Sequence, residues 1–290
     1  MNAVVETTRA PVAAPHATHK FKLLLRREFW EHKGGFFWAP LVAGGIDLSM
    51  LAASMWPFIV LAFVVFFYCL GALYDERKDR SVLFWKSLPL SDRDTVLSKV
   101  ASATLVAPAL ATGAAIVTMF GFLLVASTVV MLHGGNPIQL LWGPGSPLKM
   151  AALLVASIPV YALWALPTVG WLLLCSAWSR SKPFLWAIMI PVFAGIFVTW
   201  FDLMPAINLE AAWFWKNVVG RMLLSVAPGT WIDAATFEHG NFDGPGAISQ
   251  LFSLKTTYST LLSPSLWIGV AAGAAMIIGA IRLRRWRDEG

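Results

Sequence analysis

The stretch at 74–99, "YDERKDRSVLFWKSLPLSDRDTVLSK", holds 11 of the chain's 38 charged residues in 26 positions and has apolar sequence on both sides. The segment 34–73 before it contains one charged residue, Asp47, and the segment 100–148 after it contains none. About 20 apolar residues are enough to cross the hydrocarbon core of a bilayer as a helix. The charged stretch is therefore predicted to be a loop between membrane helices.

The composition of the whole chain supports this interpretation. Hydrophobic residues make up 58% of the 290 residues, charged residues make up 13%, and the mean hydropathy is +0.67. A soluble domain has about a quarter charged residues. Because lipid offers no hydrogen-bond partners to the backbone, and because the alternating pattern of a membrane barrel is absent, the crossings must be helices. The sequence predicts an all-α integral membrane protein.

The charge-free runs divide into six predicted transmembrane helices. The segment 34–74 is treated as two short helices, because a single helix of that length would reach roughly 60 Å, about twice the hydrocarbon thickness. The first of the two is brief, since Asp47 lies near its end. It is either short and tilted, or some outer-loop sequence near Asp47 is missing. The predicted crossings are 35–50, 52–73, 100–131, 150–177, 184–203 and 265–281.

The positive charges orient these helices, because Lys and Arg in short loops stay on the cytoplasmic side. Of the 22 Lys and Arg residues, 18 fall before residue 34, in 74–99, at 180–182 or in the tail after 281. Both termini and the charged loop are therefore predicted to be cytoplasmic, which requires an even number of crossings. This topology accounts for the net charge of +6 without a nucleic-acid partner.

Three segments outside the crossings have their own character. Residues 1–18 have no apolar core of the signal-peptide type and are predicted to be a disordered cytoplasmic lead. In residues 19–33 the apolar residues fall along one helical face, and basic residues lie among them. This pattern is typical of an amphipathic helix on the inner leaflet. Residues 205–264 form the longest outer segment and are predicted to contain short interfacial helices before the last crossing.

Several classes of function are disfavoured by what the sequence lacks. Cys69 and Cys175 both fall inside predicted crossings, so a disulfide is not expected, and the five histidines have no metal-binding spacing. No motif of a nucleophile, an acid–base pair or a metal site is present. The dipeptide Gly-Lys is absent, which excludes a phosphate-binding loop of the G-x-x-x-x-G-K-[ST] type. The chain is therefore predicted to be no enzyme, and any ATP-driven function needs a separate subunit.

The loop at 74–99 divides at Pro89, which cannot lie inside a helix. After it, Ser91 and Asp94 have the spacing of a capping box at the start of a new helix. Before it lies a short apolar segment that includes Phe84 and Trp85. These aromatic residues either lie in the lipid interface beside a solvated charged flank, or they dock onto a cytoplasmic partner.

The order of residues in this loop resembles the first cytoplasmic loop of ABC-2-type transporter permeases. The resemblance rests on Glu76-Arg77, the apolar segment 82–85, the step Leu88-Pro89-Leu90-Ser91, and Lys99. It implies a loop motif of Glu76, Arg77 and Lys99. It also implies a coupling helix that docks onto an ATP-binding subunit and consists of Ser81, Val82, Leu83, Phe84, Trp85, Lys86, Ser87, Leu88 and Pro89.

The resemblance further implies the domain plan and the partners. Residues 34–290 would form one six-helix permease domain of an ATP-binding-cassette exporter, preceded by a connecting helix at 19–33. The expected partners are a cytoplasmic ATP-binding subunit, a second permease chain and membrane lipid, in the inner membrane of a bacterium. ATP and Mg would be bound by the partner, and no cofactor by this chain. The alternative function is a non-transporting membrane scaffold or assembly factor that uses the same loop to recruit a cytoplasmic ATPase or another protein.

The sequence also offers a candidate path for an apolar substrate. It comprises Trp164 and Trp171 in the fourth crossing and Trp213 and Trp215 in the outer segment, although tryptophans that contact lipid or anchor helices at the interface are more common. In the last crossing, Gly and Ala residues recur at four-residue steps between 269 and 279. Small residues at this spacing permit close helix packing, either within one chain or between two.

Overall fold

The fold is described from a computed structural model, which covers residues 39–79, 91–143, 147–204, 210–231 and 253–288. These ranges are helical and contain no strand. Five of their helices are long and apolar enough to cross a membrane, so the chain is a multi-pass membrane protein. The predicted lead at 1–18, the amphipathic helix at 19–33 and the coupling helix at 81–89 lie outside the described residues.

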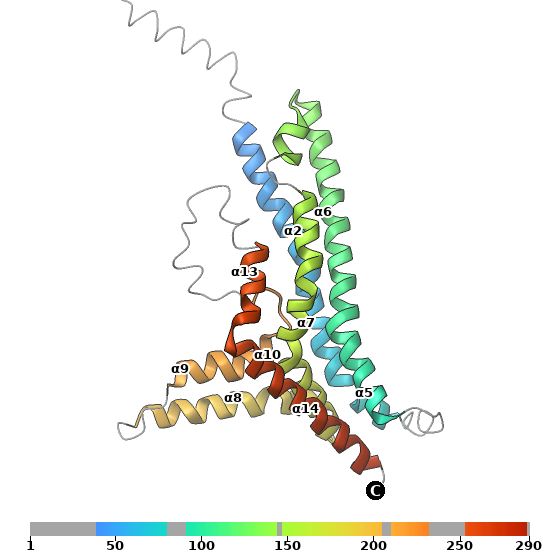
Figure 1. The fold of residues 1–290 in the computed structure, drawn as a ribbon, viewed down its shortest axis with the longest axis vertical. Helices are drawn as coiled ribbons and strands as arrows, with labels where there is room; N and C mark the ends of the chain where they lie inside the picture. Colours follow the sequence, from blue (N-terminus) through green and yellow to red (C-terminus); the bar gives the residue numbers. More distant parts are fainter. Residues whose placement is uncertain (1–38, 80–90, 144–146, 205–209, 232–252, 289–290) are drawn as a thin grey trace, which may run out of the picture.

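The helices at 39–71, 107–132 and 147–178 stand side by side, the helix at 264–288 crosses them obliquely, and the helix at 183–202 extends sideways from them (Figure 1). In the amino-terminal half the elements are α2 (Ala39–Gly71), α3 (Tyr74–Lys78), α5 (Asp92–Ala101), η2 (Ser102–Val106), α6 (Ala107–Leu132) and η3 (Ile138–Trp142). In the carboxy-terminal half they are α7 (Pro147–Trp178), α8 (Pro183–Asp202), α9 (Ala211–Phe214), η4 (Trp215–Val219), α10 (Gly220–Leu224), α13 (Leu254–Ser259), η5 (Thr260–Leu262) and α14 (Pro264–Asp288).

The predicted crossings at 52–73, 100–131, 150–177, 184–203 and 265–281 are each contained, to within a few residues, in one of the five membrane-length helical stretches. Those stretches are Met55–Lys78, Asp92–Leu132, Ile138–Trp178, Pro183–Asp202 and Pro264–Trp286. The prediction works here because a charge-free run fixes where a helix can lie in lipid. Short helices also precede the last crossing, as expected for the described parts of 205–264.

The division of 34–73 into two short helices is wrong for the described residues, because α2 continues without a break from Ala39 to Gly71. The sequence has no proline between Pro40 and Pro57, and a lone acidic residue such as Asp47 lowers helix propensity by less than 1 kcal/mol. Nothing in this stretch therefore forces a turn. As a result α2 begins at the end of the molecule opposite the C-terminus (Figure 1), and a sixth crossing remains a prediction.

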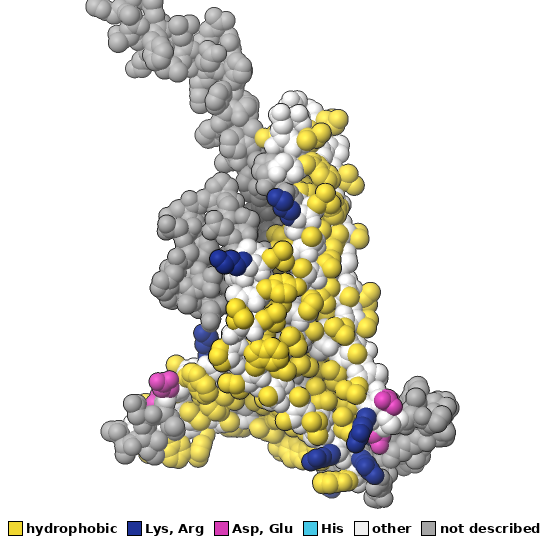
Figure 2. Space-filling view, in the orientation of Figure 1, with side chains coloured by type: hydrophobic (Ala, Val, Ile, Leu, Met, Phe, Trp, Pro, Cys, Tyr) yellow, Lys and Arg dark blue, Asp and Glu magenta, His cyan; other side chains and the backbone are white. Residues whose placement is uncertain are grey.

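The core lies where α2, α5, α7 and α14 meet, near the end of the molecule that holds the C-terminus. Val65 and Cys69 of α2, Leu172 and Leu173 of α7, and Ala280 of α14 are each no more than 1% exposed. Elsewhere, large apolar side chains cover the surface of the long helices, and charged side chains gather near the C-terminus (Figure 2). An apolar exterior of this extent is expected where helices face lipid.

α7 and α14 approach each other closely because both helices carry glycine at the contact. A Cβ atom added to Gly170 would lie 2.6 Å from the carbonyl oxygen of Gly273, and one added to Gly273 would lie 2.7 Å from the backbone of Leu166. Gly279 is also close to α7, through Leu174. These glycines of the small-residue pattern of the last crossing therefore pack within one chain.

Candidate functional site

Four charged side chains meet where the two described ends of the 74–99 loop come together with α14. Lys99 Nζ lies 2.7 Å from Glu76 Oε1, and Arg284 Nη1 lies 2.9 Å from Glu76 Oε2. Arg284 Nε also donates a hydrogen bond to Asp92 Oδ1, at 3.1 Å. We call Glu76, Asp92, Lys99 and Arg284 the charged junction. It links α3 and α5, at the two ends of the loop, directly to the last membrane helix.

Burial distinguishes the junction from an ordinary surface ion pair. The side chain of Arg284 is 5% exposed, and those of Glu76 and Lys99 are 17% and 16% exposed. Surface pairs contribute at most about 1 kcal/mol, whereas a buried charge that loses its partner is strongly destabilising. The two cations and two anions balance, so each charge is compensated inside the cluster. We therefore expect the junction to hold its three helices together.

Local sequence explains how α5 presents its part of the junction. Ser91 is the N-cap of α5, and its Oγ accepts a hydrogen bond from the backbone N–H of Asp94 at 3.1 Å, as predicted. The carboxylate of Asp94 accepts from the Ser91 hydroxyl at 2.7 Å rather than from the backbone N–H of a full capping box. Asp92 and Lys99 are seven residues apart and so lie on one face of the helix. That face points toward Glu76 and Arg284.

A second contact ties the start of the loop to the end of α7. The hydroxyl of Ser176, which is fully buried, donates to Leu70 O at 2.7 Å and accepts from the backbone N–H groups of Leu73 and Tyr74 at 3.1 and 3.0 Å. It thereby satisfies backbone groups that the break between α2 and α3 leaves without helical partners. Ser176 therefore joins the break between α2 and α3 to α7 through three hydrogen bonds.

Arg77 strengthens the same contact from the loop side. Its Nη2 donates to the carbonyl oxygens of Ser176 and Ser179, the second at 3.0 Å, just where α7 ends. A cation that binds the last carbonyls of a helix satisfies unpaired acceptors and interacts favourably with the helix dipole. Arg77 therefore caps α7, so a displacement of α3 would pull on α7 as well as on α14.

We expect Ser176→Ala to lower the free energy of unfolding by about 1–3 kcal/mol, because buried backbone groups at the α2–α3 break would lose their partner. The measurement is unfolding in mixed micelles of a mild detergent and sodium dodecyl sulfate. Ser157→Ala is the matched control, since Ser157 is also on α7 but donates only to Leu154 O within its own helix. Equal stability of the two variants would contradict the role given to Ser176.

The structure brings together the three residues of the predicted loop motif. Glu76 and Lys99 are paired directly, and Arg77 lies on the same short helix as Glu76 and caps α7. Asp92 and Arg284 complete the junction but were not predicted. Arg284 is 208 residues from Glu76. In the sequence it is one of several basic residues that indicate only that the C-terminus is cytoplasmic. Nothing in the sequence distinguishes Arg284 from the other three arginines of the C-terminal tail.

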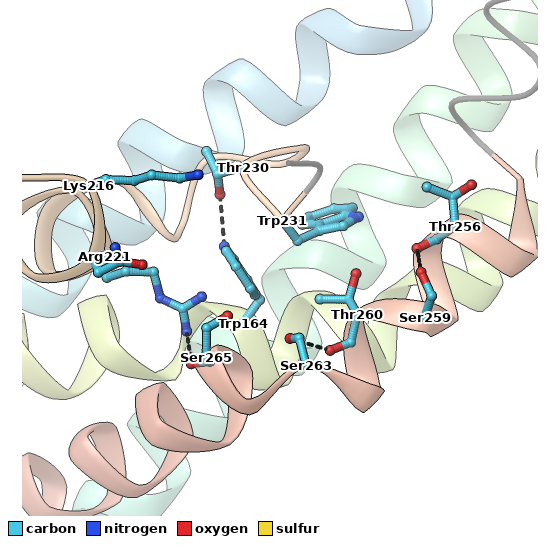
Figure 3. Close-up of a pocket in the computed structure, with 11 residues that line it drawn as sticks. Trp164, Lys216, Arg221, Thr230, Trp231, Thr256, Ser259, Thr260, Ser263 and Ser265 are labelled. Carbon is cyan, nitrogen blue, oxygen red and sulfur yellow. Dashed lines mark hydrogen bonds between the residues drawn. The ribbon is translucent and has the colours of Figure 1, made fainter. Parts of the chain in front are cut away.

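A second polar site lies at the other end of α14, where α7, α10 and α13 surround a cavity of about 350 Å³ (Figure 3). Of the four tryptophans proposed as a substrate path, only Trp164 lines this cavity. The cavity itself was not predicted. Its lining residues are Trp164, Lys216, Asn217, Arg221, Thr230, Trp231, Thr256, Ser259, Thr260, Ser263 and Ser265.

The other three tryptophans have separate environments. Trp171 is 9% exposed and donates from Nε1 to Ala187 O, which joins α7 to α8. Trp215 donates from Nε1 to Thr199 Oγ1 at 2.9 Å and packs closely over Gly195, which joins η4 to α8. Trp213 is 57% exposed. Trp171 and Trp215 thus connect helices, and the four residues do not form one continuous lining.

The chain matches no protein-family model, and no curated protein or solved structure is significantly similar to it. Among the residues that the structure describes, no three His, Cys, Asp or Glu side chains are grouped as a metal site would require. The function of the chain is therefore inferred from its own residues, above all from the charged junction and the polar cavity.

Proposed function

We propose that this chain is the transmembrane permease subunit of an ATP-binding-cassette exporter and that a separate cytoplasmic subunit hydrolyses the ATP. The observation that carries the proposal is the charged junction. It connects both ends of the loop that resembles the coupling loop of ABC-2-type permeases to α14, and the neighbouring Arg77 connects the first end of that loop to α7. A loop that transmits force requires such connections, whereas a loop that only joins two helices does not.

The proposed mechanism follows from these contacts. The ATP-binding subunit docks on residues 81–89 and moves them when its nucleotide sites close. The movement reaches α3 and α5. Glu76 of α3 and Asp92 of α5 both bind Arg284 of α14, and Arg77 of α3 binds the end of α7. α7 and α14 then move as one body, because their backbones touch at Gly170 and Gly273. Two such permease chains would open a path between them, with the junction on the cytoplasmic side.

The proposal is tested by purifying the tagged full-length chain from its native membrane in a mild detergent and identifying what accompanies it. We expect an ATP-binding protein with a phosphate-binding loop to copurify in near-equal amount. The double variant F84A/W85A should retain less than about a tenth of that protein, since a few buried aromatic residues carry most of the binding energy of an interface.

The matched control is F193A/W200A, which removes the same two residue types from α8. Phe193 and Trp200 are 57% and 64% exposed on a helix of membrane-spanning length, so they are expected to contact lipid. Full retention of the ATP-binding protein by F84A/W85A would contradict docking at 81–89. A scaffold would also copurify with a partner, but an exporter must in addition move substrate into inverted membrane vesicles when ATP is supplied.

A further inference from the structure

The polar cavity has a strongly basic character. Lys216 and Arg221 extend into it from η4 and α10, and hydroxyl-bearing residues of α13 and η5 face them across the cavity (Figure 3). No Asp or Glu is among its described lining residues. A cavity between membrane helices is expected to be lined mainly by apolar residues, and ionisable groups placed there usually mark a site of function.

Arg221 is held in a defined position inside this cavity. Its guanidinium carbon lies 3.6 Å from the centre of the Trp164 ring, a cation–π contact. On the other side Nη2 lies against Gly269, so closely that a Cβ atom added there would overlap it. The indole of Trp164 is itself fixed by a hydrogen bond from Nε1 to Thr230 Oγ1, at 2.9 Å. The planar guanidinium is therefore held between the Trp164 ring and Gly269 without the help of a ligand.

The clamped guanidinium has unused hydrogen-bonding capacity. Among the residues that the structure describes, the buried Arg221 Nη1 has no hydrogen-bond partner, and Nη2 reaches only Ser265 O, at 3.5 Å. A second buried donor of the cavity, Trp231 Nε1, likewise has no partner within the described parts of the chain. Burial lowers the pKa of Arg221 to about 10, so the side chain still carries its charge at neutral pH. A buried donor without a partner costs about 1–3 kcal/mol, and a ligand with acceptor oxygens removes that cost.

The location of the cavity indicates the class of ligand. Along α14, Ser265 and Arg284 are 19 positions apart, or about 30 Å, and along α7, Trp164 is 14 positions, or about 21 Å, from the end at Trp178. If the charged junction lies at one membrane surface, the cavity therefore lies in the opposite half of the bilayer. Phosphate is the anionic group of the lipid headgroups that border this half, and a guanidinium binds it through paired N–H donors.

We propose that the cavity around Arg221 is a binding site for a phosphate group, carried either by the headgroup of an anionic lipid or by inorganic phosphate. Arg221 donates to the phosphate oxygens from Nη1, Lys216 adds a second positive charge, and Trp164 and Gly269 keep the guanidinium in place. The site does not depend on the proposed transport function, since it would bind phosphate in a scaffold as well as in a permease.

The lipid arm of the test uses the full-length chain in nanodiscs of equal parts phosphatidylglycerol and phosphatidylcholine, and native mass spectrometry counts the lipids that stay bound. The free-anion arm uses equilibrium dialysis against radiolabelled inorganic phosphate. In whichever of the two assays detects binding, we expect Arg221→Gln to weaken that binding about 10- to 100-fold. This is the range for loss of a hydrogen bond to a charged group. Lys149→Gln, which removes an exposed cation of α7 outside the cavity, should bind as the wild type does.

Gly269→Ala provides a second variant that keeps the charge and displaces the guanidinium, and it should weaken binding to a similar extent. Retention of phosphatidylglycerol but not of free phosphate identifies a lipid site, and the reverse identifies a site for the free anion. If the folded wild-type chain prefers neither anion, or if Arg221→Gln binds as the wild type does, the cavity holds only water and the proposal is wrong. Neither arm involves ATP, so its failure would leave the exporter proposal untouched.

Discussion

Arg284→Ala is expected to lower the free energy of unfolding by about 2–3 kcal/mol, because it removes the cation that bridges Glu76 and Asp92. Breaking a fully buried ion pair costs about 3–5 kcal/mol. The effect should be smaller here, because Glu76 keeps Lys99 as a partner and Asp92 is 27% exposed. Unfolding in mixed micelles with sodium dodecyl sulfate measures the change.

The control for this prediction is Arg282→Ala, which removes an exposed arginine of the same helix. A double-mutant cycle of Arg284→Ala with Asp92→Ala should give a coupling energy of at least about 1 kcal/mol, as contacting residues of one network do. If Arg284→Ala is no more destabilising than Arg282→Ala, the junction does not hold the helices together. It could not then transmit movement from the loop to α14.

Gly170→Ala is expected to destabilise the chain by about 1–3 kcal/mol, the usual cost of overpacking. The added Cβ would lie 2.6 Å from the carbonyl oxygen of Gly273, and a backbone atom cannot rotate out of the way as a side chain can. The two helices would have to separate at the point where they should move as one body. The effect should appear in the same unfolding measurement, with a loss of ATP-driven activity in the assembled complex.

Gly113→Ala is the matched control for the packing prediction. Gly113 also lies inside a long membrane helix, but a Cβ atom added to it has no neighbour within 4 Å. Alanine is a better helix former than glycine by about 1 kcal/mol, so this variant should be neutral or slightly more stable. If Gly170→Ala were equally harmless, α7 and α14 would not be in backbone contact.

The charge-free runs of the sequence predicted the membrane helices well, because a long apolar segment must cross the bilayer as a helix. The run 150–177 illustrates this, because α7 covers all of it. The error at α2 has a local cause. The length of 34–73 suggested two crossings, but a membrane helix can exceed the hydrocarbon thickness, and a turn needs residues that end a helix. Asp47 is not such a residue.

The two polar sites were only partly predictable. Glu76, Arg77 and Lys99 lie in one short stretch, so a resemblance of that stretch to a known loop could mark them. Arg284 and Asp92 are separated by 192 residues, and their pairing depends on how α14 crosses α5. In the sequence, Arg221 is only one of the four Lys and Arg residues that fall outside the groups predicted to be cytoplasmic. Its stacking on Trp164 and its unpartnered Nη1 are properties of tertiary packing and have no signal in the sequence.

The central claim is that this chain works as the membrane half of an ATP-driven exporter, and ATP hydrolysis by the complex captured on the tagged chain tests it most directly. We predict hydrolysis that elutes with the chain, rises when the complex is reconstituted in liposomes, and falls to background in F84A/W85A but not in F193A/W200A. A folded chain that leaves its native membrane with no ATP-binding protein and no hydrolysis, or a complex whose hydrolysis is unchanged in F84A/W85A, would contradict the claim.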